Sequence, residues 1–199
     1  MSSFCVIGSM NIDLIARIDQ FPTTGETRFG SNFLMRPGGK GANQATGLAR
    51  LGADVKMVGK VGSDVFGEHY TRAMETESLD ARYVEKENNI STGVALIQVD
   101  DNGNNRIIIV DGANKLVDIP FIDPIISKLK TCEVFLFQLE IPLETTVYGL
   151  KRAKDIAATT ILNPAPALEI PDEVYPVYRL SYSEQRRVVR PLKHEHIIK

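Results

Sequence analysis

The segment PGGKGAN, at residues 37–43, places three glycines, a lysine and an asparagine in front of a run of small residues. Glycine lets backbone N–H groups approach a ligand closely, and the start of a helix offers unpaired donors with a partial positive charge. Lys40 and Asn43 are one helical turn apart, so both side chains can face one bound molecule. The segment predicts a polar binding loop; the alternative is a flexible loop that leads into an ordinary helix.

Two familiar phosphate-binding loops do not fit this segment. A Walker loop has Ser or Thr directly after its Gly-Lys pair, whereas Gly41 follows Lys40 here. The dinucleotide-binding fingerprint needs a third glycine at the position that Gln44 occupies. The loop is therefore not expected to bind a nucleotide phosphate in the manner of either motif.

Three further polar residues are candidates for the same site. Asn11 and Asp13 are two positions apart where a strand is predicted to open, so their side chains face one side. A carboxylate in an apolar segment can accept hydrogen bonds from two neighbouring hydroxyls, which is how proteins hold sugars. Glu140 ends a buried strand, at the edge where open α/β sheets place ligands. The alternatives are a capping or solvent-facing Asp13 and a Glu140 that pairs with a helix terminus.

Alternating strands and helices must position these residues. Residues 92–100 and 105–111 read as strands that flank an Asp-Asn-Gly-Asn turn, which predicts an antiparallel hairpin. The remaining βα order favours a parallel sheet with covering helices. The expected strands are 4–8, 13–21, 54–62, 133–140 and 158–163, and the expected helices are 40–51, 63–78, 121–130 and 143–155. The NPAPA segment at 163–167 is expected to be a loop, because its two prolines disfavour a helix interior.

The quoted segments resemble the ribokinase family of sugar kinases. The matching segments run in the family's order through residues 4–176: GSMNIDLI at 8–15, PGGKGANQA at 37–45, VGKVGSDVFG at 58–67, STGVALI at 91–97, QLE at 138–140 and NPAPA at 163–167. The resemblance implies a three-layer α/β/α fold with a mostly parallel central sheet and a small β-sheet lid. It implies a partial core from residues 1–12, 37–91 and 112–176, and a lid from 13–36 and 92–111.

The same resemblance implies a site and a reaction. The ribose pocket would be lined by Asn11, Asp13, Gly39, Lys40, Asn43 and Glu140, with Ala95 and Ile109 as apolar lid contacts. The alternatives are a solvated helix-start lysine and, for the two apolar residues, plain sheet core. The implied reaction is ATP-dependent phosphorylation of D-ribose to ribose 5-phosphate, with ATP and Mg2+ as cofactors and a monovalent cation such as K+. The lid implies a homodimer, since sheet pairing between subunits protects exposed strand edges.

The sequence departs from the family in two motifs. The family's Asn-x-x-Glu stretch near magnesium and its Gly-Ala-Gly-Asp block, which carries the catalytic base, do not occur here. Residues 177–199 contain six Lys/Arg and two Asp/Glu, and we interpret them as an aberrant basic tail. We therefore expect the C-terminal part of the fold, the catalytic base, the magnesium site and the nucleotide pocket to be missing. The alternative function is an inactive sugar-binding or dimerising fragment, unstable alone or self-associated.

Composition excludes several other classes of protein. The formal net charge of −2 gives no overall field to attract nucleic acid or an anionic membrane, and no apolar run is long enough to span a bilayer. Cys5 and Cys132 are far apart, which disfavours a disulfide framework or a zinc site. His194 and His196 lack a third ligand, so a solvated tail is favoured over a metal site. We expect a cytoplasmic protein with no nucleic-acid or membrane partner.

Overall fold

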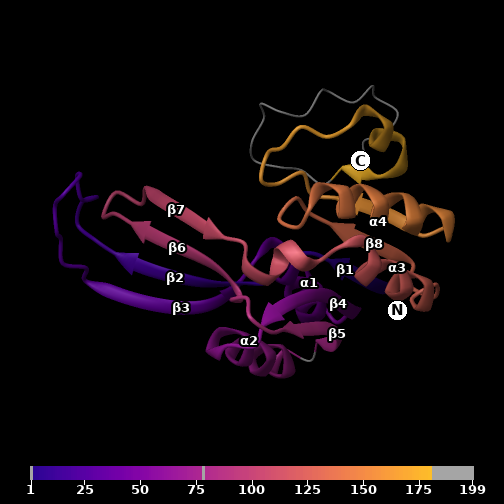
Figure 1. Ribbon diagram of the computed structural model, residues 1–199, viewed down its shortest axis with the longest axis horizontal. Coiled ribbons are helices and arrows are strands. Elements are labelled where there is room, and N and C mark those ends of the chain that lie inside the picture. The colour runs from indigo at the N-terminus through magenta and orange to yellow at the C-terminus, as the bar shows by residue number, and fades with distance from the viewer. Residues whose placement is uncertain (1, 78, 181–199) are drawn as a thin grey trace.

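The computed structural model describes residues 2–77 and 79–180 (Figure 1). The rest of the predicted basic tail, including both of its histidines, lies outside the described residues. A six-stranded sheet forms the centre, and every neighbouring pair of strands in it is parallel. Its order is β10 (Arg179–Leu180), β9 (Thr159–Leu162), β8 (Val134–Phe137), β1 (Ser3–Ile7), β4 (Asp54–Gly62) and β5 (Asp80–Glu87).

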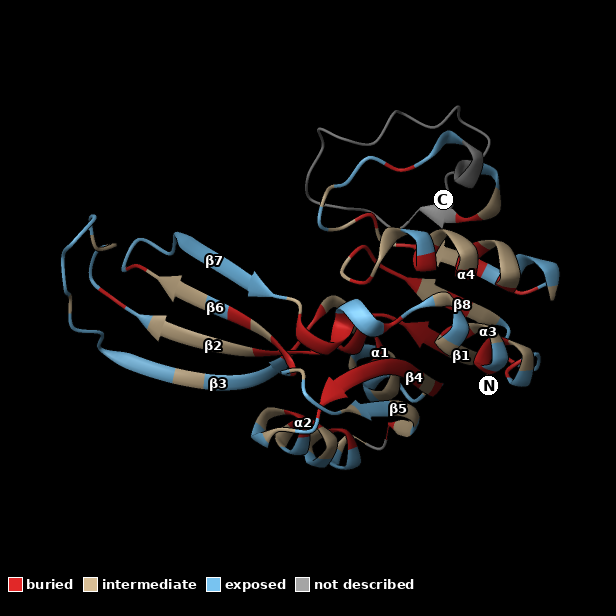
Figure 2. Ribbon diagram, in the orientation of Figure 1, coloured by how far each residue is buried: buried red, intermediate tan, exposed pale blue. Residues whose placement is uncertain are grey.

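Helices cover both faces of this sheet, because successive residues of each strand point to opposite sides. On one face Val6 and Met57 pack with α1 (Lys40–Arg50) and α2 (Val65–Thr76). On the other face Ile7 and Phe137 pack with α3 (Ile119–Lys128) and α4 (Leu143–Asp155). Figure 2 shows β1 and β4 buried between these layers. The three-layer α/β/α fold predicted from the sequence is confirmed.

A second sheet extends from the core, on the left of Figure 1. Its order is β3 (Asn32–Gly38), β2 (Asn11–Arg17), β6 (Gly93–Val99) and β7 (Asn105–Val110). The predicted hairpin is present as the antiparallel pair of β6 and β7. We call these four strands the lid sheet. Its edge strand β7 is exposed along its whole length, as Figure 2 shows.

The order of the central sheet fixes where a ligand can bind. The chain runs from β1 to β4 and β5 on one side, and then to β8, β9 and β10 on the other. The reversal falls between β1 and β8, which are neighbours in register from Phe4–Val134 to Ile7–Phe137. In open α/β sheets the crevice outside the carboxyl ends of such a strand pair is the usual ligand site. Both the loop after β1 and Glu140 after β8 lie at this crevice.

Some expected elements differ from the observed ones. Helix α3 begins at Ile119 rather than at 121, because Asp118 caps it through Phe121 N (2.9 Å) and Pro120 fits the first turn. Strand β8 ends at Phe137, so Gln138–Glu140 form a loop beyond it. Strand β5 was not expected. None of the helices in the described ranges combines the length and apolar character needed to cross a bilayer.

The start of the predicted aberrant tail continues the core, which corrects the boundary at 177. A short helical turn, Asp172–Val177, leads into β10, and β10 pairs with β9 in parallel. Tyr178 is buried in the cluster around Phe135 and Leu162. The sequence pattern missed this strand because two residues are too few to show a period.

Candidate functional site

The first turn of α1 lies against the loop that follows β1. Gly39 has φ of +87°, and a Cβ atom there would lie 2.8 Å from both Ser9 O and Asn11 N. A Cβ atom on Gly41 would lie 2.7 Å from the backbone of Gly8 and Ser9. The Ala42 N–H donates to Ser9 O at 3.0 Å. The glycines of the predicted binding loop are therefore needed to bring the helix N-terminus against the end of β1.

Glu140 is held at this junction by both of its carboxylate oxygens. Oε2 accepts hydrogen bonds from Ser9 Oγ at 2.6 Å and from Lys40 N at 2.9 Å, and Oε1 lies 3.4 Å from Lys40 Nζ. The side chain of Glu140 is 9% exposed and that of Lys40 is 38% exposed. The carboxylate thus pairs with the helix terminus, as the alternative reading of the sequence supposed, and also faces the lysine ammonium.

Asp13 belongs to the same cluster of charges. It lies on β2, and a Cβ atom at Gly38 would overlap its carboxylate, so the carboxylate sits directly over the end of β3. Partial burial raises the pKa of Asp13, the neighbouring Glu140 carboxylate raises it further, and Lys40 lowers it. Two carboxylates and one ammonium therefore share a half-buried site.

Asn11 lies beside them and is buried. Its Oδ1 accepts a hydrogen bond from Asn114 Nδ2 at 2.7 Å, and Asn114 is itself buried. The predicted residues did not include Asn114 or Ser9. Ser9 lies inside the quoted segment 8–15, and Asn114 ends a Gly-Ala-Asn run directly after the hairpin, so each had a weak local signal.

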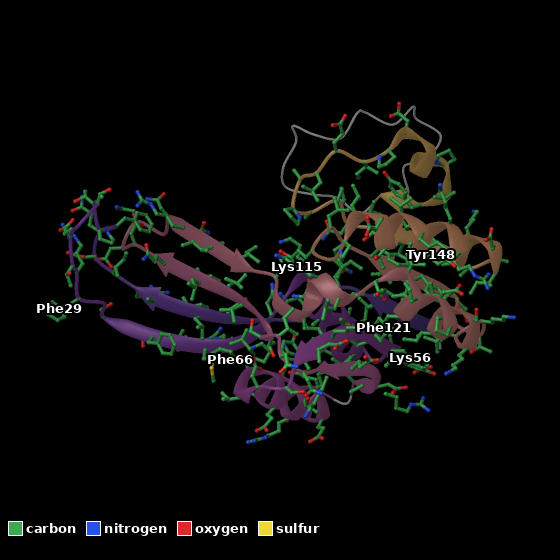
Figure 3. The ribbon with its side chains drawn as sticks, viewed as in Figure 1. Phe29, Lys56, Phe66, Lys115, Phe121 and Tyr148 are labelled. Carbon is green, nitrogen blue, oxygen red and sulfur yellow. The ribbon has the colours of Figure 1, made fainter. Side chains whose placement is uncertain are left out.

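Ala95 and Ile109 lie on the Asp13 side of the lid sheet. Asp13 is in register with Ala95, and Ala95 with Ile109, so the three side chains share one face. Ile109 and Glu140 both line a cavity of about 310 Å³ between the lid sheet and the core. Lys115, labelled at this junction in Figure 3, also lines it. The full lining is Ile109, Asp111, Lys115, Leu139, Glu140, Ile141, Pro142, Pro166 and Leu168.

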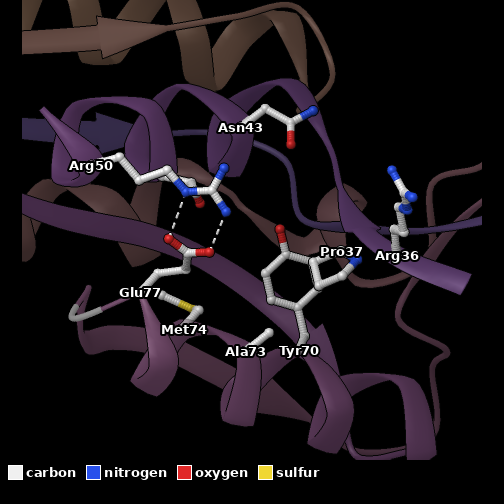
Figure 4. A pocket seen from close by; sticks show the side chains of 9 residues that line it. Arg36, Pro37, Asn43, Arg50, Tyr70, Ala73, Met74 and Glu77 are labelled. Atoms are coloured by element: carbon white, nitrogen blue, oxygen red, sulfur yellow. Dashed lines mark hydrogen bonds and ion pairs between the residues drawn. The ribbon is translucent and has the colours of Figure 1, made fainter.

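The structure does not bring Asn43 into that cavity. Asn43 is exposed and lines a separate cavity of about 310 Å³, together with Arg36 and Tyr70 (Figure 4). The reason is the orientation of α1, whose buried residues Ala42 and Ala45 fix the helix face that meets the core. Lys40 is not among the residues that line either cavity, so the convergence of Lys40 and Asn43 on one molecule stays a prediction.

Within residues 2–77 and 79–180, no group of three or more His, Cys, Asp or Glu side chains is arranged to hold a metal ion. The Asp13 and Glu140 carboxylates instead share the single ammonium of Lys40. We therefore assign no step to a magnesium ion on these residues.

Residues 1–170 match the pfkB family of carbohydrate kinases. The chain belongs to this family. Among curated members, it is 42% identical over 170 residues to a deoxyribokinase of Salmonella typhi and 41% identical over 176 residues to a ribokinase of Schizosaccharomyces pombe. Each alignment covers 85% of this chain, and 56% and 55% of the relatives. This pfkB-family chain thus spans about half the length of the curated relatives it matches.

Solved structures of the family agree with the fold. A ribokinase from Thermotoga maritima superposes with a TM-score of 0.82 at 34% identity, covering 90% of this chain and 59% of the other. The Arabidopsis thaliana ribokinase, solved in complex with ribose and ATP, gives a TM-score of 0.82 at 31% identity, with 90% and 60% covered. The ribokinase-like architecture expected from the sequence is confirmed by these neighbours.

Proposed function

We propose that this chain is the sugar-binding part of a pentose kinase that phosphorylates D-ribose with ATP to give ribose 5-phosphate. Its ribokinase and deoxyribokinase relatives support a pentose, and a relative solved with ribose and ATP supports the pairing of substrates. The proposed setting is the cytoplasm, without nucleic-acid or membrane partners. The net charge of −2 agrees with this setting.

The observation that carries the proposal is the convergence of Asp13, Lys40 and Glu140 outside the carboxyl ends of β1 and β8. Sugar hydroxyls both donate and accept hydrogen bonds. The carboxylates offer acceptors, while the ammonium and the Asn11 amide offer donors. A polyhydroxylated neutral molecule matches this alternation of donors and acceptors, whereas an anion would be repelled by the two carboxylates.

The described residues would bind and orient the sugar. Asp13 would accept from two hydroxyls, and Lys40 would donate to a hydroxyl while it keeps Glu140 in place. The lid sheet would cover the sugar from the side of Ala95 and Ile109 and exclude water from the reacting oxygen. ATP would supply the phosphoryl group. The sequence holds no Gly-Ala-Gly-Asp block, so no residue of this chain is assigned as the base.

A homodimer through the lid sheet is part of the proposal. Met35, Leu14, Leu96 and Ile108 form one row across the four strands, on the face opposite Asp13. Three of them are substantially exposed: Met35 by 39%, Leu96 by 43% and Ile108 by 64%. A contiguous apolar row on a sheet with an open edge favours association with a second copy.

A second candidate function uses the same residues without catalysis. The chain would bind a sugar, or dimerise, without transferring phosphate. The cluster of Asp13, Lys40 and Glu140 and the exposed apolar row of the lid sheet serve both candidates, which differ in whether phosphate is transferred.

One pair of measurements separates the two functions. D-ribose and 2-deoxy-D-ribose are titrated into the full chain by calorimetry, and the chain is then incubated with ATP, Mg2+ and the better ligand while ADP release is followed. Binding with turnover supports the kinase, and binding without turnover supports the non-catalytic candidate. Absence of binding by either sugar would refute both assignments of the site.

A further inference from the structure

We propose that Asn114 is a positioning residue that fixes the direction of the Asn11 amide, so that Asn11 presents its NH2 group to the sugar. This inference rests on the proposed function. It goes beyond that function because it assigns a role to a residue that does not touch the sugar.

Asn114 makes three hydrogen bonds at the exit from β1. It lies in the short helical turn Gly112–Leu116, which directly follows the lid strand β7, and is only 1% exposed. Its Oδ1 accepts from Met10 N at 2.9 Å. Its Nδ2 donates to Asn11 Oδ1 at 2.7 Å and to Met10 O at 3.3 Å. The chain leaves the core for the lid sheet at Met10 and Asn11, and it returns to the core at Asn114. The buried Asn114 side chain thus joins these two places.

The chemistry of these partners determines both amide orientations. A backbone N–H only donates, so the group of Asn114 that faces Met10 N must be its oxygen. The Asn114 Nδ2 group therefore faces Asn11, and Asn11 must accept this hydrogen bond with its Oδ1 atom. The amide of Asn11 cannot turn over without placing two NH2 groups against each other in a buried site, where an unpaired donor is costly.

The NH2 end of the Asn11 amide is then left free to donate to a ligand. Within residues 2–77 and 79–180, Asn11 Nδ2 makes no hydrogen bond. This nitrogen is not among the fully buried atoms without a partner, so it retains some solvent exposure. Asn11 and Asp13 share one face of β2. The site thus offers a fixed donor beside the Asp13 carboxylate, and a sugar hydroxyl can accept from one while it donates to the other.

Gly93 leaves room for this pair. It is in register with Asn11 across β2 and β6, and a Cβ atom at Gly93 would overlap both Asn11 Oδ1 and Asn114 Nδ2. The lid strand β6 therefore begins with the one residue type that lets the two amides meet.

The test is a double-mutant cycle on D-ribose binding by the full chain. Asn114→Asp keeps the acceptor for Met10 N but replaces the donor to Asn11 with an oxygen, so the Asn11 amide must turn its NH2 group away from the sugar. We expect Asn114→Asp and Asn11→Ala each to weaken ribose binding by about tenfold. In the Asn11→Ala background, Asn114→Asp is expected to change affinity by less than about twofold, because its effect passes through Asn11.

Thr160→Val is the matched control. It removes another buried hydrogen-bond donor, which bonds to Val177 O far from the lid, and should leave ribose affinity unchanged. The inference fails if Asn114→Asp binds like the wild type, or if its loss is equal in both backgrounds. If the wild type itself does not bind ribose, the proposed function fails and the inference falls with it.

A second measurement covers the case in which Asn114→Asp does not fold. The side-chain NH2 signals of Asn11 in the wild-type chain are identified as the pair lost in Asn11→Asp, and ribose is added. We expect these signals to shift on binding, and to shift more than those of Asn114. Unchanged Asn11 signals at saturating ribose would overturn the inference.

Discussion

The Ser9 hydroxyl donates a hydrogen bond to Glu140 Oε2 at 2.6 Å, and Ser9 Oγ accepts one from Gly41 N at 3.3 Å. This pair joins the carboxyl ends of β1 and β8 to the first turn of α1. Glu140 is thereby held with its second oxygen toward Lys40. The charged part of the site is assembled before any ligand arrives, which lowers the ordering cost of binding.

Replacing Ser9 with Ala should weaken both the fold and the site. The Glu140 carboxylate would lose its shortest hydrogen bond in a place that is 9% exposed, at a cost of about 1–3 kcal/mol in the free energy of unfolding. Ribose affinity should fall several-fold, because Glu140 and Lys40 would no longer be fixed. Urea denaturation and calorimetry measure the two effects. Ser3→Ala removes an exposed hydroxyl bonded to Thr131 O and is the control; equal results for both variants would contradict the role of Ser9.

Gly38→Ala should disturb Asp13 while the surrounding strands remain. The new Cβ atom would overlap the Asp13 carboxylate, so the carboxylate must move and ribose affinity should drop by at least about tenfold. Gly47→Ala is the matched control: it lies on the exposed side of α1 with no atom near its Cβ position, and should stabilise the helix by about 0.5–1 kcal/mol. Wild-type ribose affinity in Gly38→Ala would argue against a sugar contact at Asp13.

The raised pKa of Asp13 predicts opposite pH trends for stability and for binding. Burial and Glu140 favour the protonated form in the fold, so the stability that the protonated carboxyl contributes is lost as pH rises from about 4 through the raised pKa. Ribose needs the ionised carboxylate as acceptor, so its affinity should fall as pH drops through the same window. Asp13→Asn should flatten both trends relative to the wild type. Denaturation and calorimetry between about pH 4 and about pH 8 check this, and parallel profiles for the two proteins would contradict it.

Much of the core could be predicted from local sequence. Strand β4 has the expected bounds of 54–62, and α1 begins at Lys40 as expected. Strand β5 escaped prediction because it is an edge strand rich in charges, with no alternation of buried and exposed residues. Lys60 of β4 pairs there with Glu85 and Glu87, so ion pairs contribute to the contact between the two strands.

The site was predictable only where its parts lie in recognisable segments. Asp13, Lys40 and Glu140 were singled out by residue type and position, and the structure brings them together. Asn114 was not, because its role depends on contacts with Met10 and Asn11 on a distant part of the chain. Spacing predicted that Lys40 and Asn43 face one molecule, and this stays a prediction because Lys40 lines neither cavity.

The proposed dimer should separate when its apolar row is charged. Ile108→Lys places an ammonium at the β7 end of the row on the exposed lid face, and we expect the chain to sediment as a monomer. Leu51→Lys makes the same change at an 86% exposed position on the core and should leave the dimer intact. Sedimentation velocity distinguishes the two. A wild-type monomer, or a dimer that persists in Ile108→Lys, would exclude the lid interface.

Calorimetric titration of D-ribose into the wild type, Asp13→Asn and Asp101→Asn tests the central claim most directly. Asp101 is an exposed aspartate in the hairpin turn, so its variant controls for the loss of one charge. We predict that Asp13→Asn loses about 2 kcal/mol of binding free energy, or about 30-fold in affinity, while Asp101→Asn binds as the wild type does. Equal ribose affinity in all three proteins would contradict the assignment of Asp13, Lys40 and Glu140 to a sugar site.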